Sequence, residues 1–254
     1  MTLAILFACF VWWFSTGAIL WMVNRGASRS ELILTAPIAA AALYALYAFA
    51  HQTGEAAAYG GFCSAIVLWG WFELAFLTGV ITGPNRKPCP LGLKGTRRFL
   101  LAWGTIAHHE FALLLAALGL GWAVSSAPEQ TGFWTFLILF FARISAKLNI
   151  YLGVPNLSHE MMPSALAHMK TYFAHRRMNW LFPVSITVLT FAIACWIERA
   201  VAAEDAGTGF VLLAALTTLA LVEHWLMVLP VRDSALWSWI TKRDAPGQGA
   251  EPAD

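Results

Sequence analysis

The stretch GGFCSAIVLWGWFELAFLTGVIT, residues 60–82, decides the fold of this chain. It contains one charged residue, Glu73, and it is followed by Gly83 and Pro84, a pair that marks a turn. At a rise of about 1.5 Å per residue, about 20 apolar residues in a helix cross the roughly 30 Å hydrocarbon core of a bilayer. The stretch therefore predicts a transmembrane helix.

Six further apolar runs of similar length occur along the chain. The sequence is 59% apolar and 12% charged, whereas soluble domains are about 25% charged. We expect an all-α, polytopic membrane bundle of about seven transmembrane helices, at about residues 3–23, 31–50, 60–82, 97–125, 132–153, 178–200 and 208–229. These spans form a single transmembrane domain over residues 1–243. The Pro-, Gly- and Ala-rich residues 244–254 are expected to be a disordered cytoplasmic tail.

Charges in the connections between the runs indicate the orientation. The connections after the first, third and fifth runs and the C-terminal tail are mainly basic, with Arg25, Arg29, Arg86, Lys87, Lys94, Arg97, Arg98, Lys170, Arg176, Arg177, Arg232, Lys242 and Arg243. The other three connections are mainly acidic, with Glu55, Glu129, Glu198, Glu204 and Asp205. Because basic loops stay in the cytoplasm, this alternation predicts a multi-pass protein of the bacterial inner membrane with its N-terminus outside and its C-terminus inside. The long cytoplasmic connection, residues 154–177, is expected to fold as an amphipathic segment at the inner interface.

The composition also bears on partners. No basic run and no aromatic stacking platform suggests nucleic-acid binding, so the partner expected for every span is the lipid bilayer. The four cysteines include no CxxC pair, which argues against a zinc ribbon.

Ionisable residues inside the predicted spans mark the candidate site. Such residues are costly in hydrocarbon, so each needs a partner, a water-filled cavity or a bound ion. The third, fourth, fifth and seventh runs contain Glu73, His108, His109, Glu110, Arg143, Lys147, Glu223 and His224. Counted from the span ends at about 1.5 Å per residue, all lie near the midplane or in the cytoplasmic half. We therefore expect a convergent polar centre inside the bundle.

Three interpretations of this centre stay open. The first is a site for iron, manganese or zinc, because carboxylates and imidazoles ligate these metals. Its candidate ligands are Glu73, His108, His109, Glu110, Glu223 and His224, with His159 and Glu160 of the cytoplasmic connection closing the site. The second is an ion-pair network, in which the three acids of the spans face Arg143 and Lys147. The third is a pigment or proton-linked role, because a neutral histidine can ligate the metal of a tetrapyrrole.

Two features of the sequence argue against the metal site. Adjacent residues on a helix point about 100° apart, so normally at most one of two neighbours such as His108 and His109 faces the centre. The Glu-x-x-His pair that is typical of di-metal helical bundles does not occur.

Several short motifs resemble one protein family. They are NRKPCP at residues 85–90, RF at 98–99, HHE at 108–110, SAKLN at 145–149, GVPN at 153–156, YF at 172–173, MN at 178–179 and FP at 182–183. Over about residues 61–187 the chain resembles the PuhE-like photosynthetic complex assembly proteins of purple phototrophic bacteria, which are encoded near the reaction-centre H subunit.

The resemblance implies a role in assembling the photosynthetic reaction centre and its light-harvesting antenna, or in adjusting bacteriochlorophyll supply to that assembly. The implied partners are reaction-centre or antenna subunits and pigment intermediates. The family brings no catalytic residues to carry over, so the resemblance names no cofactor and assigns no reaction. The density of Glu and His at one depth motivates an alternative function, which is a membrane-embedded metal-dependent enzyme, with one or two metal ions, acting on a lipid, an isoprenoid or a tetrapyrrole.

Overall fold

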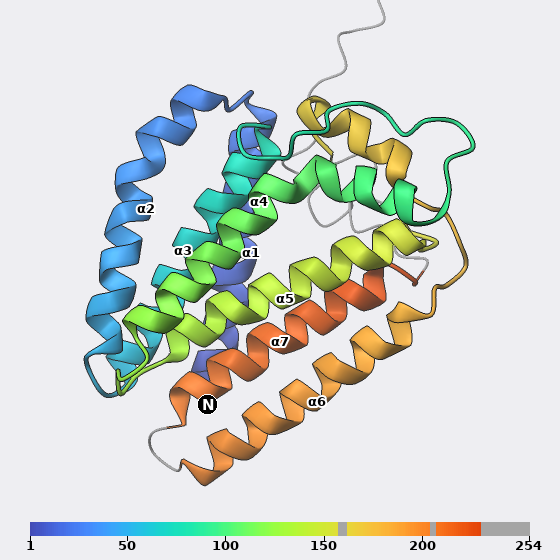
Figure 1. Ribbon diagram of the computed structural model, residues 1–254. Coiled ribbons are helices and arrows are strands. Elements are labelled where there is room, and N and C mark those ends of the chain that lie inside the picture. Colours follow the sequence, from blue (N-terminus) through green and yellow to red (C-terminus); the bar gives the residue numbers. More distant parts are fainter. Residues whose placement is uncertain (157–161, 204–206, 230–254) are drawn as a thin grey trace, which may run out of the picture.

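A computed structural model describes residues 1–156, 162–203 and 207–229 (Figure 1). The long helices are α1 (Thr2–Asn24), α2 (Arg29–Ala50), α3 (Glu55–Leu77), α4 (Gly95–Ala123), α5 (Thr131–Leu152), α6 (Leu181–Ala202) and α7 (Thr208–Leu226). A short 3-10 helix, η2 (Ser164–Tyr172), follows α5 in the chain. All seven long helices are long and apolar enough to cross a membrane, which confirms the predicted bundle of seven spans. Its orientation in the membrane stays a prediction, and the expected tail, residues 244–254, lies outside the described residues.

The third helix ends five residues earlier than predicted, at Leu77 instead of Thr82. Gly79 follows it in the left-handed conformation, with a φ of 76°. The N–H of Gly79 donates to the carbonyl of Phe76, and the N–H of Val80 donates to the carbonyl of Ala75. This is the Schellman arrangement, which satisfies the last carbonyls of a helix and turns the chain away from its axis.

The helices differ in how far the bundle encloses them. In Figure 1, α2 and α6 lie at opposite edges, and α3, α5 and α7 lie between them. Fully buried side chains of the interior include Phe62 of α3, Phe136 of α5 and Leu212 of α7. By contrast, α1 and α6 keep most of their side chains at the surface, and these side chains are largely apolar. Apolar residues all round a helix are typical of a span that contacts lipid.

Small residues bring α5 close to both of its inner neighbours. A Cβ added to Gly132 of α5 would lie 2.8 Å from the carbonyl oxygen of Gly61 in α3. A Cβ added to Gly209 of α7 would overlap the hydroxyl of Thr131 at the start of α5. Membrane helices pack through such small residues, because bilayer lipid supplies no hydrophobic force between them. The polar side chains of α5 are therefore within reach of α3 and α7.

The connection between α3 and α4 folds back onto α4. The carbonyl of Thr82 accepts a hydrogen bond from the backbone N–H of His109 at 2.9 Å, and the N–H of Asn85 donates to the carbonyl of Gly104 at 2.9 Å. Gly83 lies so close to α4 that an added Cβ would overlap the Gly104 carbonyl. Irregular backbone is tolerated in a membrane protein where it is buried against protein. The connection therefore forms part of the wall around His109.

The short helix η2 packs on the same connection. The hydroxyl of Tyr172 accepts from the side chain of Asn85 at 2.9 Å, and the guanidinium of Arg98 donates to the Tyr172 carbonyl at 2.6 Å. Leu166 and Met169 of η2 are buried and pack with Phe76 of α3. Part of the predicted cytoplasmic connection is thus a folded cover over one end of the bundle.

Candidate functional site

Helix α5 carries polar side chains on two opposite faces. Arg143 and Lys147 are four residues apart and share one face. Ser145 and Asn149 are also four residues apart, but they are offset from the first pair by two residues. Two residues correspond to about 200° of rotation around a helix. The two pairs therefore point in nearly opposite directions, and each belongs to a different polar cluster.

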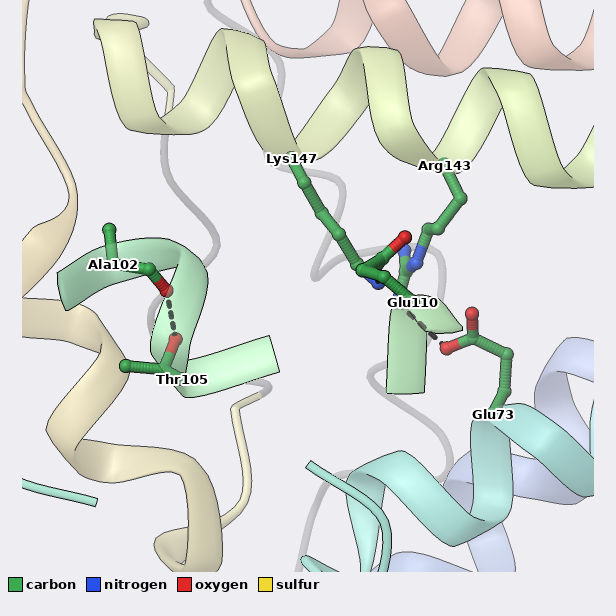
Figure 2. Close-up of polar contacts among 6 residues, drawn as sticks. All are labelled: Glu73, Ala102, Thr105, Glu110, Arg143 and Lys147. Carbon is green, nitrogen blue, oxygen red and sulfur yellow. Dashed lines mark hydrogen bonds and ion pairs between the residues drawn. The ribbon is translucent and has the colours of Figure 1, made fainter. Parts of the chain in front are cut away.

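The charged cluster joins α5 to α3 and α4. The Arg143 guanidinium donates from Nη2 to Oε2 of Glu73 at 2.9 Å, and Lys147 Nζ donates to Oε1 of Glu110 at 2.6 Å. Figure 2 shows both cations pointing from α5 toward the two carboxylates. Glu73 is 7% exposed and Glu110 is 4% exposed. Each buried carboxylate is therefore matched by one cation, and the two pairs balance in charge.

His109 of α4 lies beside this cluster and is 0% exposed. Its ring centroid lies 4.7 Å from the ring centroid of Phe76, and the Lys147 ammonium lies 4.7 Å from the centroid of the same phenyl ring. Among the described residues, neither nitrogen of the His109 imidazole has a hydrogen-bond partner, and neither do Oε1 of Glu73 and Oε2 of Glu110. Buried polar atoms normally have partners, so the cluster keeps unused hydrogen-bonding capacity.

The neutral cluster lies on the opposite face of α5 and joins it to α6 and α7. The Ser145 hydroxyl lies 2.9 Å from Nε2 of His224 and 2.9 Å from the hydroxyl of Ser185. The amide of Asn149 donates to the Ser145 carbonyl and to the Ser185 hydroxyl, both at 2.9 Å. The amide of Asn179 donates to the carbonyl of Asn149 at 3.2 Å. On this face, hydrogen bonds among hydroxyls, amides and one imidazole connect α5 to its neighbours, and none of the described contacts is an ion pair.

The tautomer of His224 follows from its contacts. Nδ1 lies 2.8 Å from the carbonyl oxygen of Ala220, which can only accept. The neutral ring therefore carries its proton on Nδ1, and Nε2 is the unprotonated nitrogen, 2.9 Å from the Ser145 hydroxyl, which donates to Ser185. His224 acts as a structural link between α7 and α5.

The structure divides the predicted polar centre. Glu73, Glu110, Arg143 and Lys147 meet in the charged cluster with His109 beside them, whereas His224 belongs to the neutral cluster. His108 of α4 and Glu223 of α7 are exposed, and the charge of Glu223 also acts on Arg143. His159 and Glu160 lie outside the described residues. The charged cluster therefore brings together most of the described members of the expected centre, and α5 separates His224 from them.

Within the described parts of the chain, no three His, Cys, Asp or Glu side chains are placed to hold one metal ion. The two buried carboxylates proposed as ligands pair with Arg143 and Lys147 instead. This geometry favours the ion-pair interpretation, and a metal site involving His159 and Glu160 stays a prediction.

The neutral cluster was not predicted from the sequence. Serine and asparagine inside a span do not by themselves indicate a polar site, because burying their uncharged side chains costs far less free energy than burying a charge. One signal was present, which is the four-residue spacing of Ser145 and Asn149. This spacing repeats that of Arg143 and Lys147 on the opposite face.

Fold and site together define a seven-span membrane protein whose helices are tied by interior ion pairs and hydrogen bonds. The family model described as "Protein of unknown function (DUF3623)" matches residues 1–248, so the chain belongs to the DUF3623 family.

A curated relative supports the resemblance noted in the sequence. The chain is 48% identical over 239 residues to the "Uncharacterized 30.4 kDa protein in puhA 5′ region" of Rhodobacter capsulatus. This match covers 91% of the chain and 87% of the relative. The position of the relative's gene is consistent with a PuhE-like protein. None of the solved structures compared with the chain matches it.

Proposed function

We propose that this protein is an integral membrane assembly factor for the photosynthetic reaction centre and its light-harvesting antenna, and that it adjusts bacteriochlorophyll supply to that assembly. The observation that carries the proposal is the relative, 48% identical, that is described by its place in the puhA 5′ region. The PuhE-like motifs support the same role. The protein would act in the cytoplasmic or intracytoplasmic membrane of a phototrophic bacterium.

The surface of the bundle supports a role that depends on helix partners. Phe10 and Phe14 of α1 and Val188 and Phe191 of α6 are exposed within their spans. In a membrane, such faces contact either lipid or the helices of another subunit. Both helices lie at the outside of the bundle and can therefore receive reaction-centre or antenna subunits without any change of the interior.

The charged cluster supports an assembly factor more than a metal-dependent enzyme. A carboxylate that ligates a metal must offer its oxygens to the ion, but Glu73 and Glu110 each give one oxygen to a cation of α5. Breaking such a pair leaves an uncompensated buried charge, which costs several kcal/mol. Recruiting the paired oxygen of either carboxylate to a metal would carry this cost, whereas the second oxygen of each has no partner among the described residues.

Deletion of the related gene in Rhodobacter capsulatus, complemented with the gene of this chain, tests the proposal. We expect the deletion strain to contain less reaction centre and antenna per cell under phototrophic growth, and the complemented strain to recover both. Absorption spectra of isolated membranes measure both complexes. Normal levels of both complexes in the deletion strain would contradict the assembly role.

Elemental mass spectrometry of the purified protein separates the enzyme from the assembly factor. The assembly proposal expects no stoichiometric iron, manganese or zinc after aerobic or anaerobic purification. A stoichiometric metal that is lost in both Glu73→Ala and Glu223→Ala variants would establish the metal-dependent alternative.

A further inference from the structure

One end of the bundle carries an excess of positive charge. Residues 74–109 and 162–197 contain no Asp or Glu, but they contain eight Lys and Arg residues, which are Arg86, Lys87, Lys94, Arg97, Arg98, Lys170, Arg176 and Arg177. Figure 1 shows the parts of the chain that carry these residues, the α3–α4 connection, η2 and the starts of α4 and α6, at one end of the bundle. None of the eight forms an ion pair with another described residue. Such an excess of cations attracts anions from outside the chain.

Contacts with the end of α5 hold the arginines of α4 and of the segment before α6 on one surface. The Arg98 guanidinium donates to the Tyr172 carbonyl of η2 at 2.6 Å and lies 4.3 Å from the centroid of the Tyr151 ring, in the last turn of α5. The side chain of Arg176 packs on Gly153, because a Cβ added to this glycine would lie 2.8 Å from Cγ of Arg176. Tyr151 and Gly153 are two residues apart. Arginines from both segments therefore pack against the same end of α5.

Exposed apolar side chains next to these arginines indicate their depth in the membrane. Leu100, two residues after Arg98 and in the first turns of α4, is 59% exposed. Trp180, three residues after Arg177 and directly before α6, is 71% exposed. Tryptophan is enriched at the membrane–water interface, where the phosphates of phospholipids also lie. The arginines at the start of both spans are therefore at the level of the lipid head groups.

We infer that this end of the bundle, the α3–α4 connection with η2 and the starts of α4 and α6, is a binding surface for anionic phospholipids. Arg97 and Arg177 are exposed and contact the lipid phosphates, because a guanidinium matches a phosphate in charge and in geometry. Lys87, Lys94 and Lys170 add attraction for a negatively charged head group. Their position at the level of the head groups favours lipid over an acidic partner protein. The inference does not depend on the assembly role or on the side of the membrane that this end faces.

Electron paramagnetic resonance of spin-labelled lipids tests the inference. The full-length protein is reconstituted in phosphatidylcholine vesicles, and the probes are phosphatidylglycerol and phosphatidylcholine with the same labelled acyl chain. The fraction of each probe whose motion the protein restricts gives its relative association. At low salt we expect phosphatidylglycerol to associate at least about threefold more strongly than phosphatidylcholine. Equal association of the two probes would overturn the inference in favour of an acidic partner protein.

The salt dependence of the same measurement separates a charge-based preference from one based on the shape of the head group. Salt screens exposed charges, so we expect the preference for phosphatidylglycerol to fall by at least about half in 1 M NaCl, where the Debye length is about 3 Å. A preference that is unchanged by salt would overturn the assignment to the exposed arginines and lysines.

The double variant Arg97→Gln/Arg177→Gln locates the surface. Its matched control is Arg25→Gln/Arg29→Gln, which also removes two exposed cations, but from a connection that contains an acid, Glu31. We expect the first variant to lose at least about half of the preference for phosphatidylglycerol and the control to keep it. Equal losses in both variants would show that net charge alone sets the preference and would overturn the assigned surface. Circular dichroism of both variants confirms that the helices are retained.

Discussion

On one face of α5, Arg143 and Lys147 reach carboxylates of α3 and α4, and on the opposite face Ser145 and Asn149 reach neutral groups of α6 and α7. In the neutral cluster both nitrogens of the imidazole are engaged. In the charged cluster each carboxylate keeps one oxygen, and the imidazole both nitrogens, without a hydrogen-bond partner in the described part of the chain. A helix interface that serves structure alone tends to use its polar atoms fully. In the neutral cluster Oδ1 of Asn149 also has no partner among the described residues, so the two faces differ in degree. The charged face leaves more of its polar atoms without a partner and therefore has the greater capacity to bind a further polar group.

The largest expected effect comes from breaking an ion pair on the charged face. Lys147→Ala leaves the buried Glu110 carboxylate without its cation. We expect this variant to lose about 3–5 kcal/mol of unfolding free energy, because an unpaired buried charge keeps its full desolvation cost. Unfolding of the detergent-solubilised protein in increasing SDS, followed by circular dichroism, measures the loss. The double variant Lys147→Ala/Glu110→Gln should recover much of it, and a double variant no more stable than Lys147→Ala would contradict this account.

A smaller loss is expected on the neutral face. Asn149 is fully buried, and its amide donates to Ser185 and to the Ser145 carbonyl. We expect Asn149→Ala to lose about 1–3 kcal/mol, because the partners left behind are buried but uncharged. The same SDS titration provides the measurement. A loss as large as that of Lys147→Ala would mean that the two faces do not differ in the way described.

The two buried histidines sharpen the comparison further. His224→Leu removes two contacts, to Ser145 and to the Ala220 carbonyl, and should cost about 1–2 kcal/mol beyond the change in packing. His109→Leu removes no side-chain hydrogen bond and should cost less than His224→Leu in the same titration. Equal losses would show that His109 has a partner in the membrane, such as a bound molecule or water.

The smallest expected effect is the coupling between the faces. Lys147→Ala and Asn149→Ala alter side chains that point in nearly opposite directions and share no hydrogen-bond partner. We expect the losses of the two single variants to add in the double variant to within about 0.5 kcal/mol. A coupling above about 1 kcal/mol would show that α5 transmits strain from one cluster to the other.

The spans could be predicted from the sequence because length and hydropathy alone determine whether a helix can cross a bilayer. The pairing of acids with Arg143 and Lys147 was also one of the predicted alternatives, since cations four residues apart share a face. The expectation that at most one of two adjacent residues faces the centre holds for two pairs and fails for a third, because His109 and Glu110 are both buried. His109 is buried and His108 exposed, and His224 is buried and Glu223 exposed.

Other features depend on contacts between distant residues. The end of α3 is set at Gly79 by a turn that hydropathy does not detect, since the apolar run continues beyond it. The separation of His224 from Glu73 depends on which side of α5 each neighbouring helix occupies. The residue types alone do not predict this arrangement of the helices. The position of His109 depends on Thr82, which belongs to a different helix–loop unit.

The hydrogen bond between Thr82 and His109 has a consequence for biosynthesis. A chain that has inserted α3 but not α4 leaves the Thr82 carbonyl without its partner, and the backbone after Gly79 without the helix against which it is buried. Exposed backbone polar groups are costly at membrane depth. We therefore expect α3 and α4 to leave the insertion machinery together, as one helical hairpin, and each to depend on the other for reaching its final depth.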